Sequence, residues 1–146
     1  MNNGHANPYR PQLARVAQVI DETPTIRTFV LDMPAPFHFR AGQFVQLTLP
    51  GVGEAPFTPS SSPLHPHSID ITVIRTGAVT EQLHQLEPGR VLGVRGPFGK
   101  GYPVEEYSGR DVLIVGGGCG LAPLRSLIYV LLDRAPDYGP IAIQYG

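Results

Sequence analysis

The sequence predicts a mainly β fold, an antiparallel barrel or sandwich of five or six strands, followed by the first part of an α/β unit. Glycine and proline, 17 and 16 residues of the 146, divide the first two thirds of the chain into short apolar stretches. Such spacing is typical of antiparallel barrels and sandwiches. After about residue 109 an apolar strand, a glycine run and helically spaced leucines follow in order, which predicts one βαβ unit.

The barrel strands are predicted from β-branched, aliphatic or alternating runs, which cover Leu13–Ile20, Ile26–Leu31, Gln43–Leu49, Ile69–Val73 and Val91–Arg95. In the third run, every second residue is apolar, so one face of that strand is expected to be buried. The segment Thr80–Leu86 predicts a short helix with Thr80 as its N-cap, ending before Pro88-Gly89.

The α/β unit is expected to contain a strand over Asp111–Val115, a helix carrying Pro123 in its first turn, and a second strand over Ile141–Tyr145. Parallel sheets normally have helices on both faces, and this unit supplies only one helix. We therefore expect that the chain stops inside a domain, which further chain or a partner protein completes.

The composition excludes several classes of function. Eleven basic and 12 acidic residues give a net charge of −1, so no basic surface for nucleic acid is expected. Cys119 is the single cysteine, which excludes a disulfide, thiolate-held zinc or an iron–sulfur cluster within the chain, and we expect no metal. The sequence shows neither a signal peptide nor a membrane-spanning apolar run, which favours a cytoplasmic protein without a membrane partner.

Two glycine-containing turns have the composition of phosphate sites. The run Gly116–Gly120 lies between a strand and a helix, where free amides and the helix dipole attract anions, although Leu121 replaces the third glycine of G-x-G-x-x-G. The turn Gly77–Thr80 precedes the short helix in the same way. Alternatively, the first is a tight structural turn and the second a capped turn. Cys119 is either an activated thiol or a small space-filler.

The segment Glu54–Pro63 combines an aromatic residue and several hydroxyls with three prolines. Phe57 is suited to pack against a flat ring, and Thr58 or Ser60 to donate a hydrogen bond to the ring edge. The alternative is a surface loop without a ligand.

These features occur in an order that resembles the ferredoxin–NADP reductase superfamily, and within it the gamma subunits of nickel–iron (sulf)hydrogenases and the electron-transfer subunit of anaerobic sulfite reductase. The resemblance extends over nearly the whole chain. Its motifs are Asn7-Pro8-Tyr9, Glu22-Thr23 with Thr28-Phe29, Ala41–Phe44, Gly53–Phe57 with Ser60–Pro63, Arg95–Gly99 and Gly116–Leu127.

The resemblance implies a six-stranded antiparallel Greek-key FAD-binding barrel over residues 1–109 and the start of an NAD(P)-binding domain over residues 110–146. The family's flavin-binding segment matches Ala55 to Thr58, with Ala55 in place of an arginine that pairs with pyrophosphate, and Arg75 is our candidate substitute. The residues implied to bind cofactor are Ala55, Pro56, Phe57, Thr58, Ser60, Ile74, Arg75, Thr76, Gly77, Val79, Thr80, Gly117, Gly118, Cys119, Gly120 and Pro123.

The implied function is electron transfer between NAD(P)H and an iron–sulfur partner through FAD, with no side chain as a catalytic residue. The implied partners are iron–sulfur subunits of a hydrogenase- or sulfite-reductase-type complex. The second half of the nucleotide domain and a cysteine-rich cluster segment, both present in the family, are absent from the sequence. A rival hypothesis is a non-catalytic assembly or regulatory module that keeps the barrel without flavin. A third is an unrelated barrel with a chance glycine loop.

Overall fold

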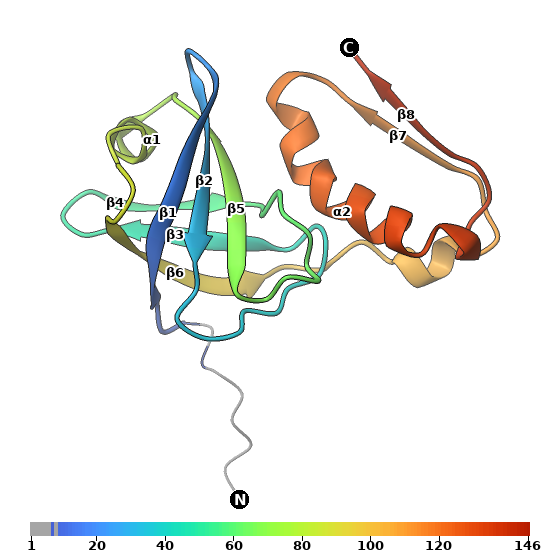
Figure 1. Cartoon of the computed structure of the whole chain (residues 1–146), viewed down its shortest axis with the longest axis horizontal. Helices are drawn as coiled ribbons and strands as arrows, with labels where there is room; N and C mark the ends of the chain where they lie inside the picture. The colour runs from blue at the N-terminus through green and yellow to red at the C-terminus, as the bar shows by residue number, and fades with distance from the viewer. Residues whose placement is uncertain (1–6, 8) are drawn as a thin grey trace, which may run out of the picture.

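The computed structural model describes residue 7 and residues 9–146, which form an antiparallel barrel beside a smaller α/β unit (Figure 1). Pro8, with which the first family motif continues, and the polar start over residues 1–6 lie outside the described residues. Figure 1 shows the barrel on the left and the α/β unit on the right, with β5 on the side of the barrel that faces α2.

Six strands form one sheet in the order β4-β3-β6-β1-β2-β5, and every neighbouring pair is antiparallel. This confirms the predicted mainly β class with a six-stranded antiparallel sheet. The strands are β1 (Gln12–Thr23), β2 (Ile26–Asp32), β3 (Phe44–Leu49), β4 (Gly53–Phe57), β5 (Ser68–Ile74) and β6 (Val91–Phe98).

Alternating burial builds the barrel core. In β3 the buried side chains are Val45, Leu47 and Leu49, as the sequence pattern predicts. In β5 the odd-numbered Ile69, Ile71 and Val73 point inward, so Asp70 and Thr72 project from the outer face. The polar side chains of Asp70 and Thr72 on β5 therefore lie outside the barrel, toward the α/β unit.

The short helix α1 (Ala78–Leu83) closes one end of the barrel. Leu83 is fully buried and Val79 packs against the core, while the helix contacts β3, β4 and β5. The predicted bounds Thr80–Leu86 are wrong at both ends. The helix begins two residues earlier, and residues 85 and 86 bond to carbonyls three residues back, a turn geometry that ends the α-helix.

The prediction missed β4, because Glu54–Pro63 has the composition of a loop. Residues 53–57 pair with β3, and Glu54 receives a hydrogen bond from Thr48 on that strand. Pro56 is accepted because β4 is an edge strand, where a missing amide does not interrupt a central ladder. The first and last strands, β1 and β6, are also longer than their apolar runs.

The α/β unit consists of β7 (Val112–Gly116), α2 (Leu121–Asp133) and β8 (Ile141–Tyr145), with β7 and β8 parallel. Short 3-10 turns occupy Val104–Tyr107, Gly118–Gly120 and Ala135–Asp137. Ile114 packs with Leu127 and Leu131 of α2, whereas Leu113 and Val115 on the opposite face are each 65% exposed. One face of the small sheet is thus covered and the other is open.

Among the described residues, no helix combines the length and the apolar character needed to cross a membrane.

Candidate functional site

The two free edges of the six-stranded sheet meet where the chain leaves β4 and passes along β5. The Ser60 amide donates to the Asp70 carbonyl at 2.8 Å, and the Asp70 amide donates to the Ser61 hydroxyl at 2.9 Å. The backbone N–H and C=O groups of successive residues in a strand point alternately to its two sides. The backbone groups of Thr72 and Ile74 therefore point to the same side as those of Asp70, away from β2. In the sheet β5 pairs with β2 alone. Backbone donors and acceptors therefore line the junction between β4 and β5.

The predicted flavin-binding segment lies on both faces of β4. Ala55 and Phe57 are opposite the inward-pointing Leu47 and Val45, and the half-buried Phe57 packs against the barrel core. Pro56 is exposed on the other face, and Thr58 is half-buried just beyond the strand.

Ser60 is fully buried, and its hydroxyl lies 3.1 Å from Thr72 Oγ1 and 3.3 Å from the Asp70 carbonyl. Its side chain therefore serves contacts within the barrel.

Arg95 on β6 is paired with Glu54, the residue before Ala55. Its Nε and Nη2 donate to the two carboxylate oxygens of Glu54 at 2.9 and 2.6 Å. This guanidinium, followed by the Thr48 hydroxyl, lowers the pKa of Glu54 below its usual value. Because two guanidinium donors of Arg95 bind one carboxylate, this side chain joins β6 to β4.

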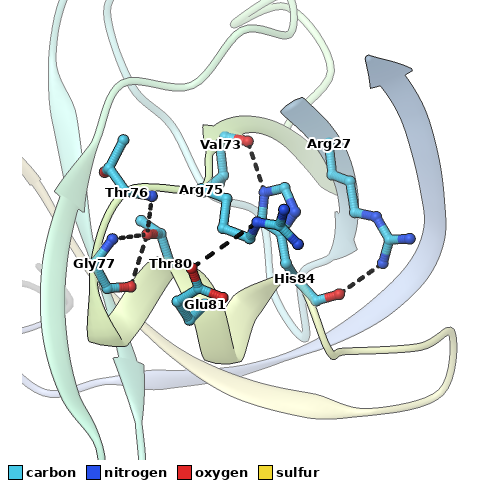
Figure 2. A network of polar contacts seen from close by, with 8 residues as sticks. All are labelled: Arg27, Val73, Arg75, Thr76, Gly77, Thr80, Glu81 and His84. Atoms are coloured by element: carbon cyan, nitrogen blue, oxygen red, sulfur yellow. Dashed lines mark hydrogen bonds and ion pairs between the residues drawn. The ribbon is translucent and has the colours of Figure 1, made fainter. Parts of the chain in front are cut away.

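The turn before α1 is organised by Thr80, but not as predicted (Figure 2). Gly77 is the N-cap, with φ −167°, and Thr80 is the third helical residue. Thr80 Oγ1 accepts from the amides of Thr76 at 2.9 Å and Gly77 at 2.8 Å, and donates to the Gly77 carbonyl at 2.9 Å. The predicted N-cap role of Thr80 is therefore wrong, because its hydroxyl reaches back to the residues that precede the helix.

Arg75 lies beside α1 at the end of β5. Its Nε is 3.9 Å from Glu81 Oε1, and its side chain is 45% exposed (Figure 2). This single, long ion pair contrasts with the two short hydrogen bonds of Arg95. The guanidinium of Arg75 is therefore held less tightly by its carboxylate than that of Arg95.

His84 is a buried residue to which the sequence prediction assigned no role. Its Nε2 lies 3.0 Å from the Val73 carbonyl, and its own carbonyl accepts from Arg27 at 2.6 Å. The ring also meets Phe29 edge-on at 6.2 Å. These contacts make His84 a structural link between α1, β5 and β2.

The glycine turn joins β7 to α2, and two of its glycines have local causes. Gly118 has φ +50°, which favours glycine. A Cβ on Gly117 would lie 2.6 Å from the Gly146 carbonyl oxygen, so the close approach of the chain after β8 explains this glycine. Gly120 has nothing within 4 Å of a Cβ, and Pro123 lies in the first turn of α2, as predicted.

A cleft of about 560 Å³ separates the glycine turn from the barrel. The barrel contributes Glu22, Ile26 and Thr72, and the α/β unit contributes Gly118, Cys119 and Arg125 among others. The structure thus brings the predicted Gly118 and Cys119 opposite residues to which the sequence prediction gave no function. For Thr72, the sequence did contain a usable indication, because its place in an alternating strand predicts that its side chain points outward.

Charged groups face each other across the interface of the two units. Partial burial raises the pKa of Asp70, and the positive charge of Arg125 on α2 opposes this rise. The interface is therefore polar on the barrel side and carries a cation on the helix side.

Comparison with known proteins identifies the barrel. The model of the oxidoreductase FAD-binding domain family matches residues 13–102. The chain belongs to this family. The resemblance inferred from the ordered motifs is thereby confirmed.

Two relatives illustrate the similarity in sequence. The sulfhydrogenase 1 subunit gamma of Pyrococcus furiosus is 40% identical over 140 residues, which cover 92% of this chain and 48% of that protein. A probable dihydroorotate dehydrogenase B (NAD(+)) electron transfer subunit of Methanocella arvoryzae is 42% identical over 118 residues, covering 81% of this chain and 42% of that one. The chain thus spans about half the length of these relatives.

Solved structures give the same fold. A cytochrome P450 reductase from Amycolatopsis superposes with a TM-score of 0.81 at 29% identity, covering 94% of this chain and 43% of that one. A ferredoxin NADP+ reductase from Neisseria gonorrhoeae, solved with bound FAD and NADP, has a TM-score of 0.81 at 18% identity, covering 93% of this chain and 57% of that one. The second comparison concerns the fold alone.

Proposed function

We propose that the barrel binds FAD along the junction of β4 and β5 and that the whole protein passes electrons between NAD(P)H and an iron–sulfur partner. The observation that carries the proposal is the meeting of the Phe57–Thr58 segment with the outward backbone of β5. An aromatic face, a hydroxyl and a row of peptide donors and acceptors lie together there, as a flat polar ring and its sugar chain require.

The residues fit the parts of FAD to different degrees. Phe57 supplies the apolar face, Thr58 the hydroxyl for the ring edge, and Ile74 with Thr76 the backbone beside the ribityl chain. The amides of Thr76 and Gly77 already donate to Thr80, so the amides of Ala78, Val79 and Thr80 are those left to face a pyrophosphate. Arg75 supplies the cation, because Arg95 is held by Glu54.

The nicotinamide nucleotide belongs at the turn from Gly117 to Gly120, on the opposite wall of the cleft from Thr72. Bound FAD would supply the conversion between two-electron and one-electron transfer, and the protein would position the rings and limit access of water. The proposed partner class is supported by relatives that are named as a sulfhydrogenase gamma subunit and an electron transfer subunit.

The visible absorption spectrum of the purified chain, before and after addition of FAD and removal of the excess, tests FAD binding. A retained flavin band is expected, with saturable binding in an equilibrium titration. Thr58→Ala and Phe57→Leu should each weaken binding, the latter because leucine keeps apolar packing without a ring face. Ser108→Ala is the control, since the exposed Ser108 hydroxyl donates to the Asp137 carbonyl in the α/β unit, outside the proposed ring position.

Ala55 favours a second candidate function, a non-catalytic assembly module, because the family arginine that pairs with pyrophosphate is absent. A folded chain that stays colourless in excess FAD would favour this alternative over the first, and saturable FAD binding would exclude it.

A further inference from the structure

A chain of three hydroxyls crosses the outer face of the barrel beside the cleft. Thr28 Oγ1 donates to Glu22 Oε1 at 2.8 Å and lies 2.9 Å from Thr72 Oγ1, which lies 3.1 Å from Ser60 Oγ. Thr28 is 1% exposed and Ser60 is fully buried, whereas Glu22 is exposed. The chain thus runs from buried hydroxyls on the outer face of the barrel to a solvent-exposed carboxylate.

The chemistry of the groups fixes the direction of these bonds. An ionised carboxylate has no proton to donate, so the single hydroxyl proton of Thr28 points to Glu22. Thr72 must then donate to Thr28, and Ser60 has its proton directed to Thr72 or to the Asp70 carbonyl. Thr72 keeps acceptor capacity for a donor in the cleft, whose wall it forms.

If the protein has the proposed function, its reaction releases a proton that these hydrogen-bonded hydroxyls could carry. Oxidation of NAD(P)H to NAD(P)+ by loss of a hydride, followed by loss of two single electrons to a partner, leaves one proton behind. That proton must leave the cleft in each turnover. The side chains facing the barrel wall from the α/β unit include Arg125, Cys119 and Tyr145, and a guanidinium does not accept protons.

We propose that Thr72, Thr28 and Glu22 form a proton relay from the cleft wall at Thr72 to the solvent-exposed carboxylate of Glu22. A proton accepted by Thr72 Oγ1 displaces the hydroxyl proton of Thr72 to Thr28, and Thr28 passes its own proton to the Glu22 carboxylate. Glu22 then releases one proton to water. Each oxygen gains one proton and loses one, and no electron moves through the side chains. Thr28 is buried and its hydroxyl connects Thr72 to Glu22, so it is the middle member of the relay.

The first measurement needs no cofactor. A proton NMR spectrum of the chain should show a Thr28 hydroxyl proton protected from exchange with water, absent in Thr28→Val. A hydroxyl that exchanges as fast as those of exposed threonines would overturn the relay, because a continuous chain of bonds keeps this proton in place.

The second measurement uses the chain loaded with FAD, reduced with dithionite and mixed rapidly with ferricyanide in H2O and in D2O. The wild-type reoxidation should show a solvent isotope effect. Thr28→Val should slow it on the order of 10²-fold, the lower end for positioned proton transfer, and Thr28→Ser should restore it. Ser108→Ala is the control, since it removes an exposed hydroxyl that donates to the Asp137 carbonyl in the α/β unit and does not line the cleft.

Glu22→Gln is the second variant, on an exposed residue whose replacement keeps the acceptor for Thr28 but cannot take up the proton. It should slow reoxidation as Thr28→Val does. Unchanged rates and isotope effects in both variants would overturn the relay while leaving FAD binding established. A wild-type chain that holds no FAD would instead contradict the proposed function itself.

Discussion

Arg95 holds Glu54 through two hydrogen bonds that span β3 and join β6 to the edge strand β4. The bonds measure 2.9 Å at Nε and 2.6 Å at Nη2. Glu54 directly precedes Ala55, so this pair fixes the start of the segment that leads to Phe57 and Thr58. A charged pair on the outer face thereby positions the strand that leads into the proposed FAD-binding junction with β5.

The Glu54 carboxylate should make stability depend on acid. Arg95 lowers the pKa of Glu54 in the folded state, so the contribution is present above the unfolded pKa and is lost as pH falls through the folded one. Glu54→Gln should therefore be less stable than wild type at neutral pH, and the difference should vanish below about pH 4. Urea unfolding at several pH values measures it, and a pH-independent difference would contradict the assignment.

Asp70 should show the opposite sign. Burial raises its pKa, so ionisation destabilises the folded state, and this penalty develops as pH rises from the unfolded pKa through the folded one. Asp70→Asn should gain stability relative to wild type between about pH 4 and pH 7. Glu87→Gln, on an exposed residue, is the comparison for a lost surface carboxylate. Equal pH dependence of Asp70→Asn and wild type would refute the prediction.

Gly42 is expected to tolerate no side chain. It has φ +91°, and a Cβ would lie 2.7 Å from the Tyr102 ring. Gly42→Ala should destabilise the protein by about 1–3 kcal/mol, the usual range for overpacking with strain. Gly120→Ala is the control, with φ −66° and nothing within 4 Å of its Cβ. Thermal unfolding of the two variants compares them, and equal melting temperatures would disprove the steric argument.

Thr80 should contribute to stability through its hydroxyl and not through its bulk. Thr80→Val keeps the shape but leaves the Thr76 and Gly77 amides without their acceptor, whereas Thr80→Ser retains it. A loss of about 1 kcal/mol is expected for valine, as for removal of a helix cap. Hydrogen exchange at these two amides checks the cause, and unchanged protection in Thr80→Val would contradict it.

The sequence predicts the barrel strands in which apolar and polar residues alternate. Val45 and Leu47 alternate with polar residues because one face of β3 is buried. The strand β4 could not be predicted, because Pro56 and the flanking glycine have the local preferences of a turn. Pairing with β3, a contact made only in the folded chain, overrides that preference.

The site was predictable as a set of segments and not as a set of contacts. The sequence places a hydroxyl at Ser60 and another at Thr72, but only the closed barrel brings them to 3.1 Å. The same holds for Thr80. Its hydroxyl could have bonded to amides in the first turn of the helix or to amides before the helix, and the structure shows the second arrangement. A choice between local bonds of similar energy is made by the backbone geometry of the turn.

The order of the strands has a consequence for how the chain folds. The edge strands β4 and β5 are separated in the sheet by four others, so the junction after β4 forms only when every ladder between them exists. Contacts between distant parts of a chain form slowly, since loop closure costs entropy before it is rewarded. A ligand that bridges this junction recognises only the completed barrel and shifts the folding equilibrium toward it. Loading with such a ligand would therefore serve as a late checkpoint of folding.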